Sequence, residues 1–217
     1  MKKALIFYGG WDGHTPKETA FLFRDMLEAE GFEVTLSDSL CVLDDYESLK
    51  VYDLFVPMWT MGSLTWEQGQ NICRAVEEGA GIAGCHGGMC DSFRDNTDWQ
   101  FMTGSQWVAH PGNDQAVYTV NMKKDSPFTQ GLEDFSIQSE QYYIHVDPAV
   151  KVHATTMFPV AKGPHSPNGQ VELPVVYTKY WGEGKVFYNS LGHTYEVFNK
   201  HHQAAELMRR GFLWAVR

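Results

Sequence analysis

The sequence predicts an α/β fold with a mostly parallel sheet and an added β-hairpin, in a single domain over residues 1–217. The first observation behind this prediction is the alternation of apolar strands with amphipathic helices through the first 90 residues, which is typical of right-handed βαβ units. The second is a series of short strand-like segments in the second half, two of them joined by a Gly-rich turn. No repeat, low-complexity tract or linker divides the sequence.

The first strand and helix are predicted from the N-terminal residues. Residues 3–8 form an apolar run, as expected of a strand buried on both faces of a sheet. Thr15 as the N-cap, Pro16 at the first helical position and Glu18 three residues after Thr15 predict a helix that starts with a capping box. Gly31 predicts the end of that helix. The same reasoning predicts strands at 32–36, 52–58 and 81–85, a short helix near 44–50 and a helix at 66–78.

The second half is predicted to be dominated by strands and to end in a helix. The last two strands form a hairpin that turns at residues 181–184, whose sequence is WGEG. An amphipathic helix is predicted over residues 201–216. The strands are predicted at 115–122, 135–145, 150–158, 173–180 and 185–191.

The composition restricts the class of partner. Hydrophobic residues make up 43% of the chain and charged residues 20%, which is ordinary for a globular protein. The formal net charge of -10 disfavours nucleic acid and anionic membranes, because both need a basic surface. The N-terminal apolar run is too short for a signal peptide and no segment approaches a membrane span, so we expect a cytoplasmic protein. The four cysteines include no CxxC pair and indicate no disulfide framework. A homo-oligomer is left open.

A glycine-rich turn follows the predicted strand at 81–85. Residues 84–88 read GCHGG, which is similar to the G-x-nucleophile-x-G turn that presents a Ser or Cys above a sheet. Here a histidine stands at the nucleophile position and the cysteine comes one residue too early. Histidine carries an acyl group poorly but is a good metal ligand or proton shuttle. We therefore expect His86 to bind a metal ion or to act as an acid–base group.

Polar residues are expected to gather at one edge of the sheet, because ligands of parallel sheets bind beyond the carboxyl ends of the strands. Neutral imidazole and carboxylate are the usual ligands of a catalytic zinc or similar divalent ion. Three such ligands and a water generate a nucleophile near neutral pH. Metal-free acid–base chemistry and purely structural histidines are the alternatives. The predicted metal ligands are His14, His86, His110 and His193, and the predicted catalytic residues are His86, Glu140 and His193.

Five segments in the same order resemble the trehalose-utilisation (ThuA-like) family, and they cover essentially the whole chain. The resemblance implies a flavodoxin-like, class I glutamine amidotransferase-like three-layer sandwich, with an acidic residue at the position of Glu140. It also implies a role in the use of trehalose or related sugars, including 3-keto derivatives. The segments are the opening strand with its His-bearing loop, GIAGCHGG, GSQWVAHPG, SEQYYIHVDP, and PVVYTKYWGEGKVFYNSLGH followed by RRGFLWAV.

The active site of the glutamine amidotransferases is not preserved in the sequence. That site needs a Cys at the glycine-rich turn and a G-H-x-E motif later in the chain. This chain has His86 at the turn, and one extra residue separates His193 from Glu196. Glutamine hydrolysis through Cys90 or Cys85 is therefore the least favoured of the hypotheses.

The favoured function is that of a metal-dependent sugar hydrolase, lyase or isomerase. The alternative is a non-catalytic carbohydrate-binding or regulatory protein that kept the cleft. A sugar is expected to lie against aromatic rings, which suit the C–H face of a pyranose, although core packing is the competing role for such rings. No nucleotide is expected, because the GGWDG loop lacks the Lys-Ser/Thr of a P-loop and a GxGxxG pattern. The candidate sugar-binding residues are Trp11, Trp59, Trp107 and Tyr142.

Overall fold

Strands and helices alternate in the first half of the chain, and strands dominate the second half. The computed structural model describes residues 1–159 and 163–217. The strands are β1 (Lys3–Gly10), β2 (Glu33–Ser37), β3 (Leu54–Thr60), β4 (Gly81–Cys85), β5 (Ser105–Ala109), β6 (Val117–Met122), β7 (Phe135–Gln138), β8 (Tyr143–Val146), β9 (Lys151–Phe158), β10 (Val171–Trp181) and β11 (Gly184–Asn189). The helices are α1 (Pro16–Ala29), α2 (Tyr46–Leu49), α3 (Trp66–Glu77), α4 (Gly87–Cys90), α5 (Thr97–Thr103), α6 (Glu196–Lys200) and α7 (His202–Ala215), with short 3-10 turns at η1 (Asp12–His14), η2 (Leu40–Leu43), η3 (Asn113–Gln115) and η4 (Ser166–Asn168).

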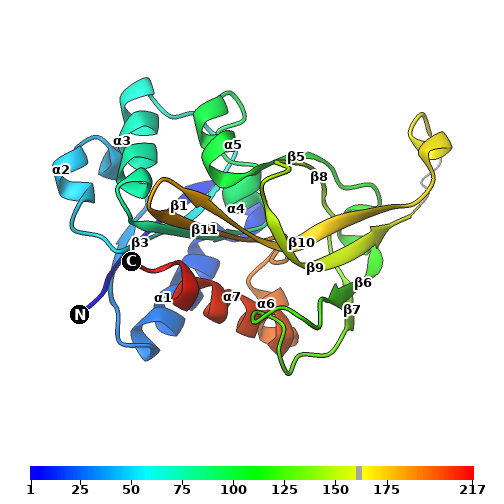
Figure 1. The fold of residues 1–217 in the computed structure, drawn as a ribbon. Helices are drawn as coiled ribbons and strands as arrows, with labels where there is room; N and C mark the ends of the chain where they lie inside the picture. The colour runs from blue at the N-terminus through cyan, green and yellow to red at the C-terminus, as the bar shows by residue number, and fades with distance from the viewer. Residues whose placement is uncertain (160–162) are drawn as a thin grey trace.

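One central sheet carries helices on both of its faces (Figure 1). In the described part of the chain this sheet has nine strands, in the order β2-β1-β3-β4-β11-β10-β9-β6-β7. Neighbouring strands run parallel from β2 to β11. They run antiparallel from β11 to β7. The predicted α/β fold with parallel sheet and hairpin is confirmed, and the antiparallel part extends beyond the predicted hairpin to β7.

Two hydrophobic layers hold the helices on the sheet, which gives the three-layer sandwich. On one face α1 and α7 contribute Phe23 and Phe212 to a buried cluster. On the opposite face α3 and α5 contribute Ile72 and Trp99. All five residues of β4 are buried, as expected of a parallel strand that is covered on both sides. The carboxyl ends of the parallel strands are therefore held in a fixed arrangement by packing on both faces.

The strand predicted over residues 135–145 is wrong as a single element. The chain forms β7 and β8 there, which pair with different partners in different sheets. Residues 139–142 connect the two strands and hold Glu140 inside the protein. Four consecutive polar residues, Gln138 to Gln141, interrupt the alternation of polar and apolar residues at this point, and the prediction of one continuous strand passed over this sign of a break. The connection matters because it brings Glu140 to the site described below.

Further elements were not predicted, and one predicted helix is shorter than expected. The sequence reasoning missed β5, α5 and α6. The predicted helix at 201–216 matches α7, but His201 has an extended backbone that separates it from α6. The predicted helix near 44–50 is a 3-10 turn followed by the single turn of α2. Short elements of this kind carry too few residues for a periodic pattern to be recognised.

Thr15 does not form the predicted capping box. Its backbone lies in the left-handed region, with φ 47° and ψ 51°, and its side chain makes no capping hydrogen bond. Its Oγ1 instead accepts a hydrogen bond from the backbone N–H of Tyr195 at 3.1 Å. A capping box does occur at the start of α3, between Thr65 and Gln68. The Thr15–Tyr195 bond joins the loop after β1 to the loop after β11, far apart in the sequence.

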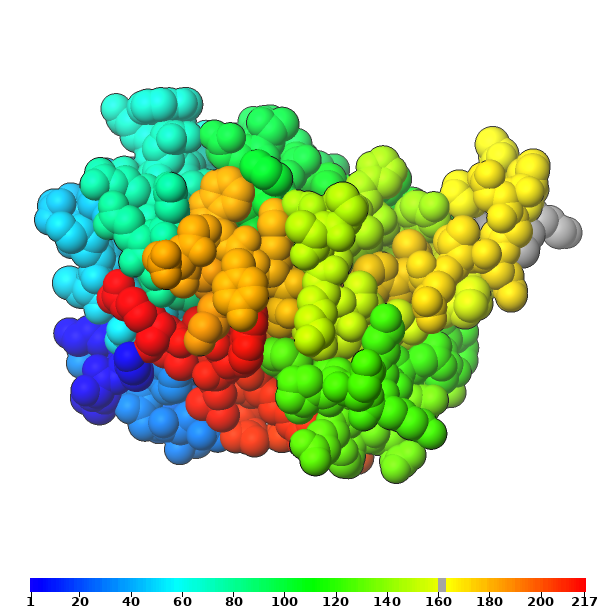
Figure 2. Space-filling view, in the orientation of Figure 1, coloured from blue at the N-terminus to red at the C-terminus, as the bar shows by residue number. Residues whose placement is uncertain are grey.

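The two ends of the chain lie close together at the N-terminal edge of the parallel strands. The backbone N–H of Arg217 donates to the carbonyl of Asp53 at 3.2 Å, and Lys2 donates to the Arg217 carbonyl. Figure 2 shows the dark blue N-terminal and red C-terminal segments meeting on the surface. Among the described residues, no helix has the length and apolar character needed to cross a membrane.

Replacing Gly211 by Ala should destabilise the fold, because α7 approaches the sheet too closely for a Cβ. A Cβ at Gly211 would lie 2.2 Å from Cε1 of Phe187, a buried ring that cannot move away freely. We expect Gly211→Ala to lower the free energy of unfolding by about 1–2 kcal/mol despite the better helix propensity of Ala. The matched control is Gly69→Ala in α3, where the added Cβ meets only the terminal amide nitrogen of Asn96, whose Oδ1 caps α5, and not a buried ring. Urea unfolding of both variants tests this, and equal stabilities would contradict it.

Candidate functional site

The carboxyl ends of the parallel strands bring three histidines together around one buried carboxylate. His14 lies in η1 after β1, His86 follows β4, and His193 follows β11. Glu140 reaches the same point from the connection between β7 and β8. His14, His86 and Glu140 are at most 5% exposed. The predicted gathering of these four residues at one edge of the sheet is therefore what the structure shows.

His86 is fixed by its backbone, by a hydrogen bond at the edge of its ring and by an aromatic ring stacked on it. Its backbone has φ 46° and ψ -139°, a strained conformation for a residue with a side chain, at the sharp turn between β4 and α4. Its Nδ1 lies 2.8 Å from the carbonyl of Ser190 and must donate to it, because a carbonyl oxygen only accepts. The ring of Tyr142 stacks on it, with centroids 3.8 Å apart. In the neutral ring, the Nε2 lone pair is thus directed at the centre of the site.

His14 is held against the glycine-rich turn and the end of β3. Its Nδ1 lies 2.8 Å from the Oγ1 of Thr60 in a buried hydrogen bond. Its ring packs so closely on Gly87 that a Cβ there would lie 2.5 Å from Cε1 of His14. Glycine at position 87 is therefore required for the imidazole to enter the site. With Nδ1 engaged by Thr60, Nε2 is the atom of His14 that faces Glu140.

One carboxylate oxygen of Glu140 faces all three imidazoles. Its Oε2 lies 3.1 Å from Nε2 of His86, 3.2 Å from Nδ1 of His193 and 3.7 Å from Nε2 of His14. The Nδ1 of His193 is buried and has no hydrogen-bond partner with acceptable geometry. The four ligand atoms lie within 4.8 Å of one another. Three imidazole nitrogens and one carboxylate oxygen thus surround a single point.

The electrostatics of the group favour a neutral imidazole beside an ionised carboxylate. Burial lowers the pKa of His86 to about 3, although the nearby Glu140 opposes this shift. Burial alone would raise the pKa of Glu140, but its close contacts with the imidazoles of His14, His193 and His86 outweigh this effect and hold the pKa well below its usual range. At neutral pH the Nε2 lone pair of neutral His86 therefore faces a carboxylate oxygen.

These residues fit a divalent metal ion by the chemistry of their donors and by an unpaired buried atom. Three imidazole nitrogens with one carboxylate are donors that suit zinc. The orphaned Nδ1 of His193 is an atom whose burial is costly without a partner. A lone pair of His86 that faces an anionic oxygen is repulsive unless a cation lies between them.

His110, the fourth histidine predicted as a ligand, lies outside this group of four. Its Nδ1 is 3.7 Å from Oε1 of Glu140, whereas the other three imidazoles contact Oε2. The same nitrogen lies 3.1 Å from Oδ1 of Asn113. Its side chain is 29% exposed, so His110 stands at the rim of the site.

A family model decides which proteins this chain is related to. The model described as trehalose utilisation (ThuA) matches residues 3–215. The chain belongs to the ThuA family. The resemblance found in the sequence motifs is thereby confirmed. A comparison with curated protein sequences finds no match.

Solved structures of ThuA-like proteins share this fold. One from Bacteroides uniformis has a TM-score of 0.76 at 21% identity, and the match covers 99% of this chain and 91% of that chain. One from Parabacteroides merdae has a TM-score of 0.76 at 18% identity, covering 99% and 89%. A structure described as a cytoplasmic protein from Salmonella typhimurium has a TM-score of 0.66 at 13% identity and covers both chains completely. At these identities the likeness establishes the fold alone.

The four aromatic residues predicted to bind sugar lie in different environments in this ThuA-family protein. Trp11 is 46% exposed and packs edge-on against His14, with ring centroids 4.7 Å apart. Tyr142 is buried in the stack on His86, while Trp59 and Trp107 pack partly buried against the hydrophobic cluster on that face of the sheet. Trp11 is thus the most accessible of the four rings, and a role in sugar binding stays a prediction for each.

Two contacts at the site involve groups that the sequence reasoning did not single out. The hydroxyl of Thr60 and the carbonyl of Ser190 each fix one nitrogen of a site histidine. Both residues stand at or just beyond the end of a buried strand, beside the loops that carry the site histidines. A polar residue that ends an otherwise apolar strand was the available signal for Thr60. A backbone carbonyl leaves no trace in the sequence.

Neither cysteine near the turn is placed to act as a nucleophile. Cys85 is fully buried and its Sγ lies 3.8 Å from Sδ of Met58. Cys90 is also buried, and the hydroxyl of Tyr188 lies 2.8 Å from its Sγ. Burial raises the pKa of both thiols well above the usual range, so both stay protonated at neutral pH. The structure therefore speaks against the amidotransferase hypothesis.

Thiol reactivity should separate one cysteine from the other three. Cys41 is exposed, whereas Cys73, Cys85 and Cys90 are buried and burial raises the pKa of Cys73 to about 12. Because the thiolate is the reactive form, we expect fast labelling of Cys41 alone in the native protein. Labelling with a chromogenic disulfide reagent, before and after unfolding in guanidinium, measures this. Fast native labelling of Cys90 would contradict the structure, and Cys41→Ser is the control that removes the fast signal.

Proposed function

We propose that this ThuA-family protein is a metal-dependent enzyme that acts on a sugar or sugar derivative, such as trehalose or a 3-keto sugar. The proposed ligands are His14, His86, Glu140 and His193, and zinc is the proposed metal. The family description supports the sugar, and the donor set supports the metal. The cytoplasm is the proposed location, supported by four free cysteines and by the name of the Salmonella neighbour.

The observation that carries the proposal is the orientation of His86. Its Nδ1 proton is committed to the carbonyl of Ser190, so Nε2 has only a lone pair to offer the carboxylate 3.1 Å away. His193 faces the same oxygen with a nitrogen that has no partner. A divalent cation among these atoms would satisfy all of them at once, whereas a single shared proton would satisfy only one pair.

The residues of the chain would have distinct tasks in such a site. A bound divalent metal supplies Lewis-acid polarisation of a carbonyl or hydroxyl oxygen, which serves hydrolysis, elimination and isomerisation alike. Glu140 contributes negative charge, and the three imidazoles stay neutral ligands. Thr60 and Ser190 fix the orientation of His14 and His86. The strained turn at His86 keeps that imidazole pointed into the site without a flexible loop.

Metal analysis tests the proposal directly. Protein purified without a His-tag and exposed to zinc should retain about one equivalent per chain after dialysis, as expected of a closed His/Glu site. His86→Ala or Glu140→Gln should reduce the retained metal to background, because each removes a ligand. Elemental analysis by mass spectrometry gives the stoichiometry. Chelation should lower the melting temperature of the wild type, since a ligand of the folded state stabilises it.

The controls separate loss of a ligand from general damage. His165→Ala should keep the metal, because His165 is exposed and bonds the hydroxyl of Tyr143. His110→Ala tests whether His110 is also a metal ligand. If this variant retains the full amount of zinc, His110 is not a ligand. Absence of stoichiometric metal from the folded wild type after zinc exposure would refute the metal site. Sugar-induced stabilisation without metal would then favour the non-catalytic carbohydrate-binding alternative.

Thr60 should affect metal affinity without touching the metal. Thr60→Val removes the hydroxyl that holds Nδ1 of His14 and leaves a side chain of the same shape. Loss of such an orienting bond typically weakens metal binding about 10–100-fold. Competition with a chromophoric chelator measures the affinity. Thr60→Ser keeps the hydroxyl and should bind metal nearly as well as the wild type, and equal affinities for all three proteins would show that the bond is unimportant.

A further inference from the structure

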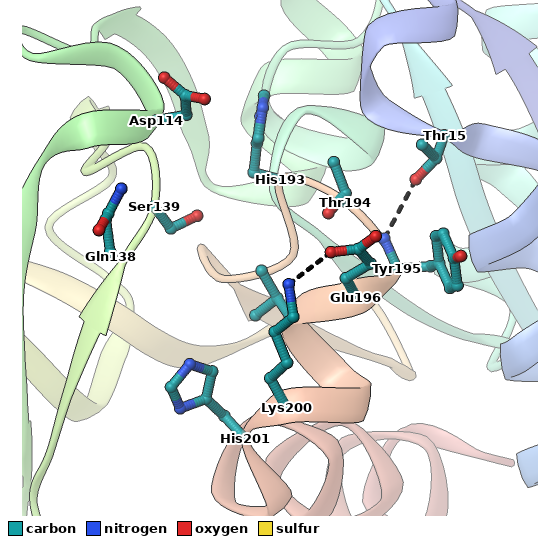
Figure 3. Close-up of a pocket in the computed structure, with 11 residues that line it drawn as sticks. Thr15, Asp114, Gln138, Ser139, His193, Thr194, Tyr195, Glu196, Lys200 and His201 are labelled. Carbon is teal, nitrogen blue, oxygen red and sulfur yellow. Dashed lines mark hydrogen bonds and ion pairs between the residues drawn. The ribbon is translucent and has the colours of Figure 1, made fainter.

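A cavity of about 350 Å³ lies beside the group of four proposed ligands (Figure 3). It borders the group directly, because both His193 and Thr15, the neighbour of His14, line it. Its volume falls at the lower end of the range for small-molecule sites, roughly 300–1,000 Å³. A molecule in this cavity would have one end at the ligand group.

Two segments that are distant in the sequence form the walls of the cavity. Figure 3 shows side chains from η3 and the end of β7 on one side. The opposite wall comes from the segment after β11 and from α6, and His201 lies below. Hydrogen-bonding groups are present on both walls. Those that the argument uses are Asp114, Ser139, Thr194, Glu196, Lys200 and His201.

The chemistry of the walls selects a neutral ligand with many hydroxyl groups. Asp114 and Glu196 carry two negative charges against the one positive charge of Lys200, which opposes a phosphate or carboxylate ligand. The hydroxyl groups of a ligand both donate and accept hydrogen bonds. They can therefore donate to the carboxylates, accept from the ammonium group and pair with the imidazoles in the same cavity. The cavity therefore differs from an aromatic sugar-binding surface: specificity would come from polar contacts at defined positions.

Asp114 and Lys200 make only local contacts and are free to turn to a ligand. The carboxylate of Asp114 accepts a hydrogen bond from the adjacent Gln115 at 3.1 Å. Lys200 pairs with Glu196 one helical turn away, and both side chains are more than half exposed. Exposed pairs of this kind are weak, so Lys200 exchanges its partner for a ligand hydroxyl at little cost.

We propose that this cavity binds the non-reacting ring of a polyhydroxylated, uncharged substrate, with Asp114 and Lys200 as its anchors. The inference rests on the proposed function, because the reacting end of the same molecule would lie at the metal ligands. Beyond the proposed function, the inference gives the substrate-binding site a position and a polar character. It also predicts that ring contacts distant from the metal determine affinity.

Calorimetric titration of the full chain tests the proposal. The probes are trehalose and methyl α-D-glucopyranoside, each titrated into zinc-loaded and chelated protein. Both probes should bind the zinc-loaded wild type. Lys200→Met and Asp114→Asn should each weaken binding about tenfold, the loss expected for one hydrogen bond to a charged group. Zinc content should stay unchanged in both variants, because neither residue belongs to the ligand group.

The matched control is Lys50→Met, which removes the lysine of a comparable exposed pair with Glu47 far from the cavity. It should bind the probes like the wild type. The proposal is overturned if neither probe binds the zinc-loaded protein, if Lys200→Met and Asp114→Asn both bind like Lys50→Met, or if inorganic phosphate binds more tightly than either sugar. Each of these results with stoichiometric zinc leaves the metal site standing. Failure to bind zinc contradicts the proposed function separately. In that case the affinities of Lys200→Met and Asp114→Asn for sugar, measured in the chelated protein, would still test the proposed cavity.

Discussion

The negative charge of Glu140 inside the protein is the constraint on which the site depends. A buried charge is costly unless neighbouring groups compensate for it. Here three imidazoles on three separate loops face one carboxylate oxygen, and neutral His86 turns a lone pair toward it. The divalent cation that we propose would supply the compensation and would hold the three loops together. The same arrangement leaves unshared nitrogen lone pairs beside the carboxylate, which is the condition a divalent cation satisfies.

The fold brings these loops to one edge of the sheet, and a small number of hydrogen bonds joins them to one another. Parallel strands covered on both faces bring their carboxyl ends to one edge. The hydroxyl of Thr15 then joins the first loop to the last through the backbone of Tyr195. The side chain of His86 joins the central turn to the last loop through the carbonyl of Ser190. The site is thus cross-linked by hydrogen bonds between loops, and its geometry does not depend on any single loop being rigid.

The turn at His86 shows how one backbone geometry serves different chemistry. A strained strand-to-helix turn presents whatever side chain stands at its apex, with glycines around it that allow close approach. In this chain the apex presents an imidazole, and the neighbouring thiols of Cys85 and Cys90 are buried and protonated. The fold is shared with solved ThuA-like structures at low identity, and a fold alone does not fix the side chains at this edge.

The sequence by itself determined the parallel half of the sheet and the edge at which His14, His86 and His193 gather. Apolar strands and βαβ alternation are local patterns, and the carboxyl ends of parallel strands always share an edge. Only the tertiary structure decided how Glu140 reaches that edge, because the break between β7 and β8 is set by their different partner strands. It also decided that His110 stays at the rim and that Thr60 and Ser190 orient the imidazoles, since such contacts join residues that no local pattern relates.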